Sequence, residues 1–308
     1  MTKCSAPGKM ILLGEHAVVF GKPALALAIG LRITSTVKPS NQYSVNGYPM
    51  RKKHHAYISA SLDEAWEGPP INIETESQIP SGSGLGSSAA VTVSCVAAMT
   101  SSKGKIDYEK VARRSFEVEC KVQGRASPTD TSTSTHGYGV LISPDKLDNL
   151  LWTIEKGERV WNIHHCEVPS LKFVVGHTGI HAATGPLVAK VKKLVDSDGD
   201  AKKAVDRIGE IVLEGVEAVS KRDKKRIGAL MEEDHQLLNQ LGVGHPKLEK
   251  LVMASKERSY GSKLTGAGGG GSMMALTDDP EAVAEAISAA GGTPIIVEVG
   301  CEGVRTER

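Results

Sequence analysis

The stretch Ile79-Pro80-Ser81-Gly82-Ser83-Gly84-Leu85-Gly86-Ser87-Ser88-Ala89-Ala90 is the most informative segment of this chain. Its three glycines and four serines lead into an apolar run, 89–99, which contains neither glycine nor proline and predicts a helix. Glycine lets a ligand approach the backbone, and the start of a helix offers unpaired N–H groups and a positive dipole end. The segment therefore favours a phosphate site, although a flexible Gly/Ser linker is the alternative.

We call residues 80–88 the phosphate loop. Serine hydroxyls in such a loop can also ligate Mg²⁺, a cation that prefers oxygen. The loop lacks the Gly-x-x-x-x-Gly-Lys-Ser/Thr pattern of a Walker P-loop, and the chain contains neither His-Arg-Asp nor Asp-Phe-Gly of protein kinases. A nucleotide would therefore be bound by a different scaffold.

Composition places the chain among ordinary globular proteins. It has 308 residues, of which 40% are hydrophobic and 24% charged, and this length suits two domains. The net charge of +1 gives no reason to expect nucleic acid or an anionic membrane as a partner. The five cysteines are scattered, the longest apolar runs are far shorter than a membrane span, and the polar start is unlike a signal peptide. These features predict a cytoplasmic protein without disulfides or structural zinc.

Hydrophobic patterning predicts an α+β protein with two units. Strands are expected early, over 3–7, 10–13 and 24–37, followed by the helix after the phosphate loop and a second helix near 108–122. Further strands are expected at 139–143, 151–163 and 171–176, then helices over 201–220, 226–241 and 246–257. A glycine-rich segment at 263–272 precedes a strand, a helix at 280–290 and a final strand at 293–298. Strands, then helices, then strands suggest a boundary near Val168, with units at 1–168 and 169–308.

The helix predicted over 108–122 carries an acid on its apolar side. Glu119 falls in line with Ala112, Phe116 and Val122 at helical spacing, whereas Glu117 falls with Arg113 and Lys121 on a face suited to exposed ion pairs. A carboxylate that faces a core needs a partner, so Glu119 is expected to meet a cation or a basic group. The alternative is a surface acid whose carboxylate reaches solvent.

A second acid stands alone in a segment rich in hydroxyl groups. Asp130 lies within Ser127-Pro128-Thr129-Asp130-Thr131-Ser132, part of a loop predicted over 123–139. Taken by itself, this aspartate fits a turn cap as well as it fits a catalytic group.

Several motifs together resemble those of the GHMP small-molecule kinases. They are Pro7-Gly8-Lys9, Gly14-Glu15-His16-Ala17-Val18-Val19-Phe20-Gly21, the phosphate loop, and Lys263-Leu264-Thr265-Gly266-Ala267-Gly268-Gly269-Gly270-Gly271. The resemblance spans nearly the whole chain in the expected order, and Gly14–Val19 and Ser127–Asp130 look most like the members that phosphorylate mevalonate. It implies an N-terminal domain like domain 2 of ribosomal protein S5, which carries the phosphate loop, Lys9 and Asp130. A ferredoxin-like C-terminal domain would carry the substrate loop and the third glycine motif, with ATP between the two domains.

The resemblance also implies roles for single residues in phosphorylation of the C5 hydroxyl of mevalonate by ATP. The ATP phosphates would be held by Pro80, Ser81, Gly82, Ser83, Gly84, Leu85, Gly86, Ser87 and Ser88, with Gly268 and Gly269 closing over them or bracing the loop. Mg²⁺ would be held by Ser88, with Ser87 as the alternative, and by Glu119. Asp130 would be the general base, and Lys9 would pair with it and stabilise the alkoxide. Mevalonate would be bound by Lys9, Glu15, His16, Asp130 and Thr184, and a homodimer is a family-level expectation.

The chain departs from the family pattern at two places. In the substrate loop, 176–186, His181 stands where lysine or arginine is expected, and Gly185-Pro186 precedes the next helix; Gly244 stands where serine is frequent. These departures bear on substrate affinity and on feedback inhibition by isoprenyl diphosphates. The alternatives are a sister kinase that acts on phosphomevalonate, homoserine or galactose, and a non-catalytic nucleotide-binding relative.

Overall fold

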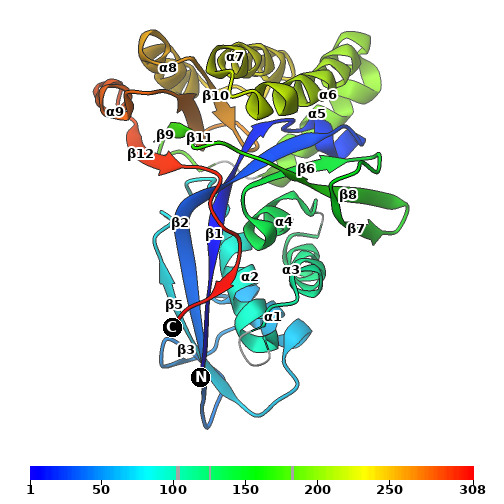
Figure 1. Ribbon diagram of the computed structural model, residues 1–308, viewed down its shortest axis with the longest axis vertical. Helices are drawn as coiled ribbons and strands as arrows, with labels where there is room; N and C mark the ends of the chain where they lie inside the picture. Colours follow the sequence, from blue (N-terminus) through cyan, green and yellow to red (C-terminus); the bar gives the residue numbers. More distant parts are fainter. Residues whose placement is uncertain (102–104, 125, 182–183) are drawn as a thin grey trace.

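A computed structural model describes residues 1–308 apart from 102–104, 125 and 182–183 (Figure 1). Its strands form two sheets, as the α+β prediction requires. The nine-stranded sheet contains β1 (Thr2–Leu13), β2 (Ala24–Pro39), β3 (Ser44–Val45), β4 (Tyr48–Pro49), β5 (Ile71–Ser77), β6 (Gly139–Ser143), β7 (Leu150–Lys156), β8 (Arg159–Cys166) and β13 (Arg305–Thr306). The four-stranded sheet contains β9 (Lys172–His177), β10 (Gly261–Thr265), β11 (Ser272–Leu276) and β12 (Thr293–Glu298).

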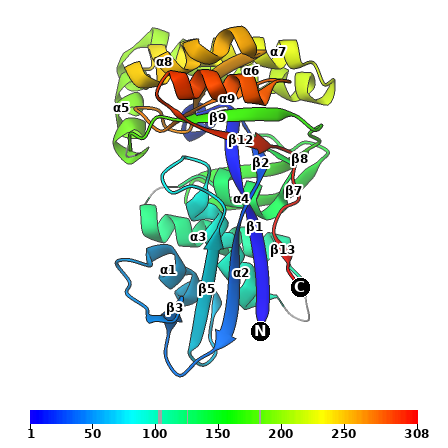
Figure 2. The ribbon, with the colours of Figure 1, turned by 90° about the vertical axis from the view of Figure 1, so that its left-hand side faces the viewer.

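The helices divide between the two sheets. The first group is α1 (Ala56–Ala65), α2 (Ser87–Thr100), α3 (Tyr108–Gln123) and α4 (Thr129–His136). The second group is α5 (Thr184–Ser197), α6 (Gly199–Ser220), α7 (Lys224–Gln240), α8 (Pro246–Ser255) and α9 (Pro280–Ala289), and Figure 2 shows α6, α7, α8 and α9 as a layer over the smaller sheet. Short 3₁₀ turns occur at Ala17–Phe20 and Lys256–Arg258. No helix among the described residues has the length and apolar character needed to cross a bilayer.

The long strand β2 organises the larger sheet. It pairs with β1 along one edge and with both β5 and β6 along the other, always antiparallel. The smaller sheet has the order β10-β11-β9-β12 and is antiparallel throughout. The boundary expected near Val168 falls between β8 of the nine-stranded sheet and β9, the first strand of the four-stranded sheet.

The C-terminal segment returns to the first sheet. Val299 pairs with Ile29, Glu302 pairs with Gly137, and β13 pairs with β1. The guanidinium of Arg32 donates hydrogen bonds to the carbonyl oxygens of Glu302 (2.8 Å) and Gly303 (2.7 Å). Figure 2 shows β13 beside β1, close to the N-terminus.

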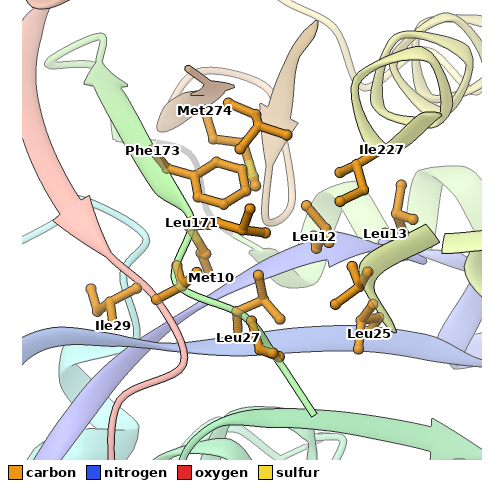
Figure 3. Packing of buried hydrophobic residues seen from close by; sticks show 14 of the residues in the cluster. Met10, Leu12, Leu13, Leu25, Leu27, Ile29, Leu171, Phe173, Ile227 and Met274 are labelled. Atoms are coloured by element: carbon orange, nitrogen blue, oxygen red, sulfur yellow. The ribbon is translucent and has the colours of Figure 1, made fainter. Parts of the chain in front are cut away.

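One hydrophobic core joins the two sheets (Figure 3). Met10 and Leu27 of the first sheet pack in the same cluster as Phe173 and Met274 of the second, and Ile227 of α7 belongs to it as well. Because protein interiors are close-packed, this shared core resists relative displacement of the sheets.

The structure contains three helices that the sequence pattern does not predict: α1, α4 and α5. α1 buries Ile58 and Leu62 beside two serines, so its apolar side was weakly marked in the sequence. α4 lies inside the segment 123–139, which was predicted as a loop because serine and threonine usually favour turns and caps. In α4 these side chains are buried, and the hydroxyls of Thr133 and Thr135 donate to carbonyl oxygens one turn earlier, both at 2.7 Å.

The third such helix, α5, includes Gly185-Pro186 in its first turn. Backbone N–H groups in the first turn have no partner within the helix, so a proline there costs no hydrogen bond.

Two predicted strand boundaries also differ from the structure. The expected strand over 151–163 is a hairpin of β7 and β8, and the early strands over 3–7 and 10–13 form the single strand β1. The five cysteines are free, as predicted.

Replacement of Gly137 by alanine should destabilise the fold at the returning tail. Gly137 has φ 82° and ψ −163°, a region open only to glycine, and an added Cβ would lie 2.1 Å from the backbone nitrogen of Gly303. Strain and overpacking together should cost roughly 2–5 kcal/mol. Urea unfolding followed by tryptophan fluorescence measures this cost. Gly157→Ala is the control, since Gly157 also has positive φ but open space around it, and should cost about 1–2 kcal/mol. Equal losses in the two variants would contradict the role given to the tail contact.

Candidate active site

Two glycines bring β1 and the phosphate loop into contact around Lys9. The register of β1 against β2 shifts between Pro7 and Lys9, which marks a bulge at Gly8. A Cβ on Gly8 would lie 2.6 Å from the carbonyl oxygen of Leu85, and a Cβ on Gly86 would lie 2.9 Å from Cγ of Lys9. The backbone N–H of Lys9 donates to the Leu85 carbonyl at 3.0 Å. This close approach holds the lysine beside the start of α2.

The phosphate loop ends at a helix terminus with free donors. Gly82, Gly84 and Gly86 have φ between 72° and 76°, and Gly86 precedes the first residue of α2. No side chain caps α2, so the N–H groups of its first turn stay available to an anion. Ser83 and Leu85 have buried side chains, and the Ser83 hydroxyl donates to the Pro80 carbonyl, so these two residues can offer a ligand only their backbone. Pro80, Ser81, Gly82 and Gly84 are exposed, and Ser87 and Ser88 are half-buried.

Lys9 and Asp130 form an ion pair although they are distant in sequence. The ammonium nitrogen of Lys9 lies 3.1 Å from Oδ2 of Asp130, and the two side chains are 5% and 31% exposed. Asp130 stands in the first turn of α4, not in a loop as predicted, and the helix gives it a fixed position. A buried ammonium thus contacts a carboxylate that is still partly open to solvent.

Glu119 is buried on α3, as its spacing predicted. It is 2% exposed, and burial together with the nearby charge of Asp130 raises its pKa well above the usual range, while Lys9 acts in the opposite direction. The polar face of α3 has ion pairs as expected, but their partners are different. Glu117 binds Lys156, and Arg113 binds Glu109.

Tyr57 is a site residue that the sequence reasoning missed. Burial raises its pKa, the charges of Glu119 and Asp130 add to the rise, and Gln123 and Ser88 oppose it. Gln123 donates a hydrogen bond to the Tyr57 hydroxyl at 3.1 Å. Tyr57 is thus close enough to Ser88 and to both carboxylates to respond to them. It lies on α1, and without that helix nothing in the sequence linked it to the site.

The residues around Glu119 can hold Mg²⁺. A buried carboxylate with a raised pKa is disfavoured as a bare anion, and a divalent cation would offset its charge. Among the described residues no group of three or more histidines, cysteines, aspartates or glutamates gathers as a complete metal cage. This donor set suits Mg²⁺, which usually takes one or two carboxylates and fills its shell with phosphate oxygens and water.

Glu15 and His16 present buried polar atoms without a partner. His16 has φ 60° and ψ −41°, an unusual conformation for a non-glycine residue, and is 5% exposed. Its Nε2 lies 2.9 Å from the Ala267 carbonyl oxygen, and burial lowers its pKa, so the neutral ring donates from Nε2 and carries a lone pair on Nδ1. Nδ1 of His16 and Oε2 of Glu15 have no hydrogen-bond partner among the residues that the structure describes. Such atoms can bind the polar groups of a ligand.

The third glycine motif braces the phosphate loop. Gly268 packs against Val243, since a Cβ would lie 2.2 Å from the Val243 carbonyl oxygen, and the N–H of Gly269 donates to that oxygen at 2.8 Å. At the end of the motif, the Ser272 hydroxyl donates to the Ser83 carbonyl at 2.6 Å. The motif therefore fixes the phosphate loop from the side of the second sheet.

The sequence pattern predicts no functional role for Lys263, the first residue of this motif. It is completely buried and forms ion pairs with Glu15 and with Asp234 of α7. A lysine within a buried strand indicates that a carboxylate is buried beside it, but the sequence does not identify which acids provide that carboxylate.

The remaining expected positions make no described contact with Lys9 or Asp130. Thr184 begins α5 and is exposed, as is His181, while 182–183 of the substrate loop fall outside the described residues. No contact described in this structure joins Thr184 to Lys9 or Asp130. At Gly244, a Cβ would lie 2.1 Å from Oδ1 of Asn239, so the expected serine would require the Asn239 amide, which donates to Glu249 at 3.0 Å, to move.

Comparisons with known proteins place the chain in a family. The family described as "GHMP kinases N terminal domain" matches residues 53–138, and "GHMP kinases C terminal" matches residues 216–293. The mevalonate kinase of Thermococcus sibiricus is 34% identical over 340 aligned positions, covering 98% of this chain and 97% of the relative. That of Archaeoglobus fulgidus is 34% identical over 312 positions and covers 98% and 99%.

Solved structures share the fold. L. major mevalonate kinase in complex with R-mevalonate superimposes with a TM-score of 0.81 at 24% identity, covering 98% of this chain and 97% of the other. Streptococcus pneumoniae phosphomevalonate kinase in complex with phosphomevalonate and AMPPNP gives a TM-score of 0.78 at 20% identity and covers 97% and 100%. The expected two-domain GHMP kinase fold is confirmed. On this full-length similarity to curated enzymes, the chain belongs to the GHMP kinases and, within them, to the mevalonate kinases.

Proposed function

We propose that Asp130 and Lys9 carry out the reaction of this family, transfer of the γ-phosphoryl group of ATP to the C5 hydroxyl of mevalonate. The observation that carries the proposal is the 3.1 Å ion pair between the buried Lys9 ammonium and the partly exposed Asp130 carboxylate. The pair lies where β1 touches the phosphate loop, since Lys9 packs directly on Gly86. A base and a cation therefore stand beside a helix terminus suited to phosphate.

In the proposed reaction, Asp130 accepts the proton of the C5 hydroxyl as the oxygen attacks the γ-phosphorus, and the bond from that phosphorus to the β–γ bridging oxygen breaks to release ADP. Lys9 stabilises the negative charge that develops on that oxygen and holds the Asp130 carboxylate in place through the ion pair. The free N–H groups of the phosphate loop and of the first turn of α2 bind the β- and γ-phosphates. Phosphoryl transfer depends mainly on such positioning and charge stabilisation.

Ser88 and Glu119 are the proposed ligands for Mg²⁺. Ser88 and Glu119 both affect the pKa of Tyr57, whereas Ser87 does not, and this supports Ser88 over Ser87 as the hydroxyl ligand. When bound, the cation supplies positive charge against the phosphate oxygens. Glu119 would supply a negative charge to the cation from a buried position on α3.

For the acceptor we propose a pocket lined by Glu15 and His16 next to Lys9 and Asp130. The unpaired Oε2 of Glu15 and Nδ1 of His16 support this, because a polyhydroxylated acid such as mevalonate can satisfy both. The crystallised L. major relative holds R-mevalonate, which supports the same acceptor. Thr184, Gly268 and Gly269 remain proposed contacts at the edges of the site.

Further assignments also remain proposals. We keep the domain boundary near Val168 and assign the returning tail after residue 298 to the first domain, because it pairs with β1, β2 and the end of α4. A homodimer in the cytoplasm that binds no nucleic acid is the proposed state of the protein.

A panel of acceptors tests the proposed function. We expect ADP release, followed by a coupled assay with Mg²⁺ and ATP, with mevalonate and little or none with phosphomevalonate, homoserine or galactose. The free atoms of Glu15 and His16 offer no additional cation for a phosphorylated acceptor. Turnover with another acceptor alone would reject the mevalonate assignment, and no turnover with any acceptor would favour a non-catalytic relative.

Replacement of Asp130 by asparagine should remove the base and leave the site's shape intact. We expect kcat to fall by roughly 10²–10⁴, the usual contribution of general acid–base catalysis, while ATP binding measured by calorimetry persists. The exposed Asp148→Asn serves as control and should leave kcat unchanged. A near-normal kcat in Asp130→Asn would show that Asp130 is not the base.

The two acids of α3 provide a matched pair of variants. Glu119→Gln should raise the Mg²⁺ concentration needed for half-maximal activity by about tenfold or more, since the ligand loses its charge. Glu117→Gln should have little effect, because it breaks only a partly exposed pair with Lys156. Mg²⁺ titrations of kcat/KM compare them directly. Similar behaviour of the two variants would contradict the assignment of Glu119.

A further inference from the structure

A fully buried ion cluster crosses from one sheet to the other. Lys263 of β10 has no exposed surface and binds Oε1 of Glu15, which follows β1 in the chain. On its other side the Lys263 ammonium lies 3.2 Å from Oδ2 of Asp234, which is also completely buried. One cation thus stands between two carboxylates that come from different parts of the chain.

Stability alone gives a weak reason for such a cluster. Desolvation of buried charges often exceeds their mutual attraction, and apolar residues of similar volume can serve as well or better. The neighbourhood is otherwise well packed, with Leu264, Leu238 and Met273 all fully buried. The cluster is therefore better explained by a role in positioning the loop that carries Glu15 and His16.

The cluster acts on the loop that carries the proposed acceptor contacts. Lys263 occupies Oε1 of Glu15 and leaves Oε2 without a partner, next in sequence to His16 with its unpaired Nδ1. The same strand is attached nearby, since the Thr265 hydroxyl donates to the Ile11 carbonyl at 3.1 Å. β10 and its loop therefore fix both ends of the turn at residues 14–16.

Asp234 in turn belongs to a helix that is tied to β10. Its neighbour His235 accepts a hydrogen bond at Nδ1 from the Leu264 backbone N–H (3.2 Å), and its Nε2 lies 3.0 Å from the Glu249 carboxylate. α7 thereby covers the open edge of β10, which pairs with a strand only on its β11 side. Asp234 is held close to Lys263 by this attachment.

We propose that Asp234 and Lys263 are positioning residues for the alcohol substrate, which hold Glu15 through Oε1 so that its Oε2 and His16 can bind the acceptor. This inference rests on the proposed function. Neither residue has exposed surface, so each acts through Glu15 and not by contact with ATP. Their loss should weaken acceptor binding selectively.

The test uses the double variant Lys263→Met/Asp234→Asn in the full-length chain. Lys263→Met alone would leave two buried carboxylates without a cation and could fail to fold. The added Asp234→Asn removes one charge, and burial already favours the protonated form of Glu15 by raising its pKa. We expect KM for mevalonate to rise at least tenfold, KM for ATP to stay within about twofold, and kcat to fall less than about threefold. Asp234→Asn alone should show a smaller rise in the same direction.

A second ion pair, between Lys22 just before β2 and Asp206 of α6, provides the control. Lys22 and Asp206 are 2.6 Å apart and partly exposed, and Lys22→Met/Asp206→Asn should leave both KM values unchanged. A folded double variant with wild-type KM for mevalonate would overturn the positioning role, as would equal increases in both KM values. If the wild-type chain itself does not turn over mevalonate, the proposed function fails and not this inference alone.

Discussion

The close contact between β1 and the phosphate loop is the constraint on which the site depends. It requires a residue without a Cβ on each side, Gly8 in the strand and Gly86 at the start of α2, because a side chain at either position would collide with the other segment. The contact places Lys9 against the helix terminus, and α4 then brings Asp130 to the lysine. The proposed cation, base and phosphate donors are thus brought together by backbone packing, before any ligand contributes energy.

The second sheet completes this arrangement. The shared core of Met10, Leu27, Phe173 and Met274 fixes the sheets relative to each other, and polar contacts across the same boundary are therefore made at fixed positions. Ser272 holds the phosphate loop, Ala267 accepts from His16, and Lys263 binds Glu15. Residues that would contact ATP and the acceptor come mainly from the first domain, whereas their orientation depends on the second. The third glycine motif therefore contributes to the site by orienting residues of the first domain, and it adds few exposed side chains of its own.

Sequence reasoning could predict the parts of the site that rest on local pattern. The phosphate loop and its helix follow from glycines before an apolar run, and the burial of Glu119 follows from helical spacing. It could not predict α4, because a buried helix made of serine and threonine has no apolar stripe to detect. It missed Tyr57 for a related reason, since α1 buries serines beside Ile58 and Leu62. Lys263 and Asp234 were missed because their pairing is a tertiary contact between β10 and α7, and no sequence spacing encodes it.

The two acids nearest the proposed acceptor show how one chain can give carboxylates different tasks. Asp130 is partly exposed and forms an ion pair with Lys9. Glu15 is buried and shares its lysine with Asp234, so burial and the second carboxylate raise its pKa to about 8. At neutral pH a carboxyl group in that position can hold a proton and donate a hydrogen bond from its free oxygen. Asp130 would then accept a proton from the acceptor while Glu15 only binds it, and the difference follows from the deeper burial of Glu15.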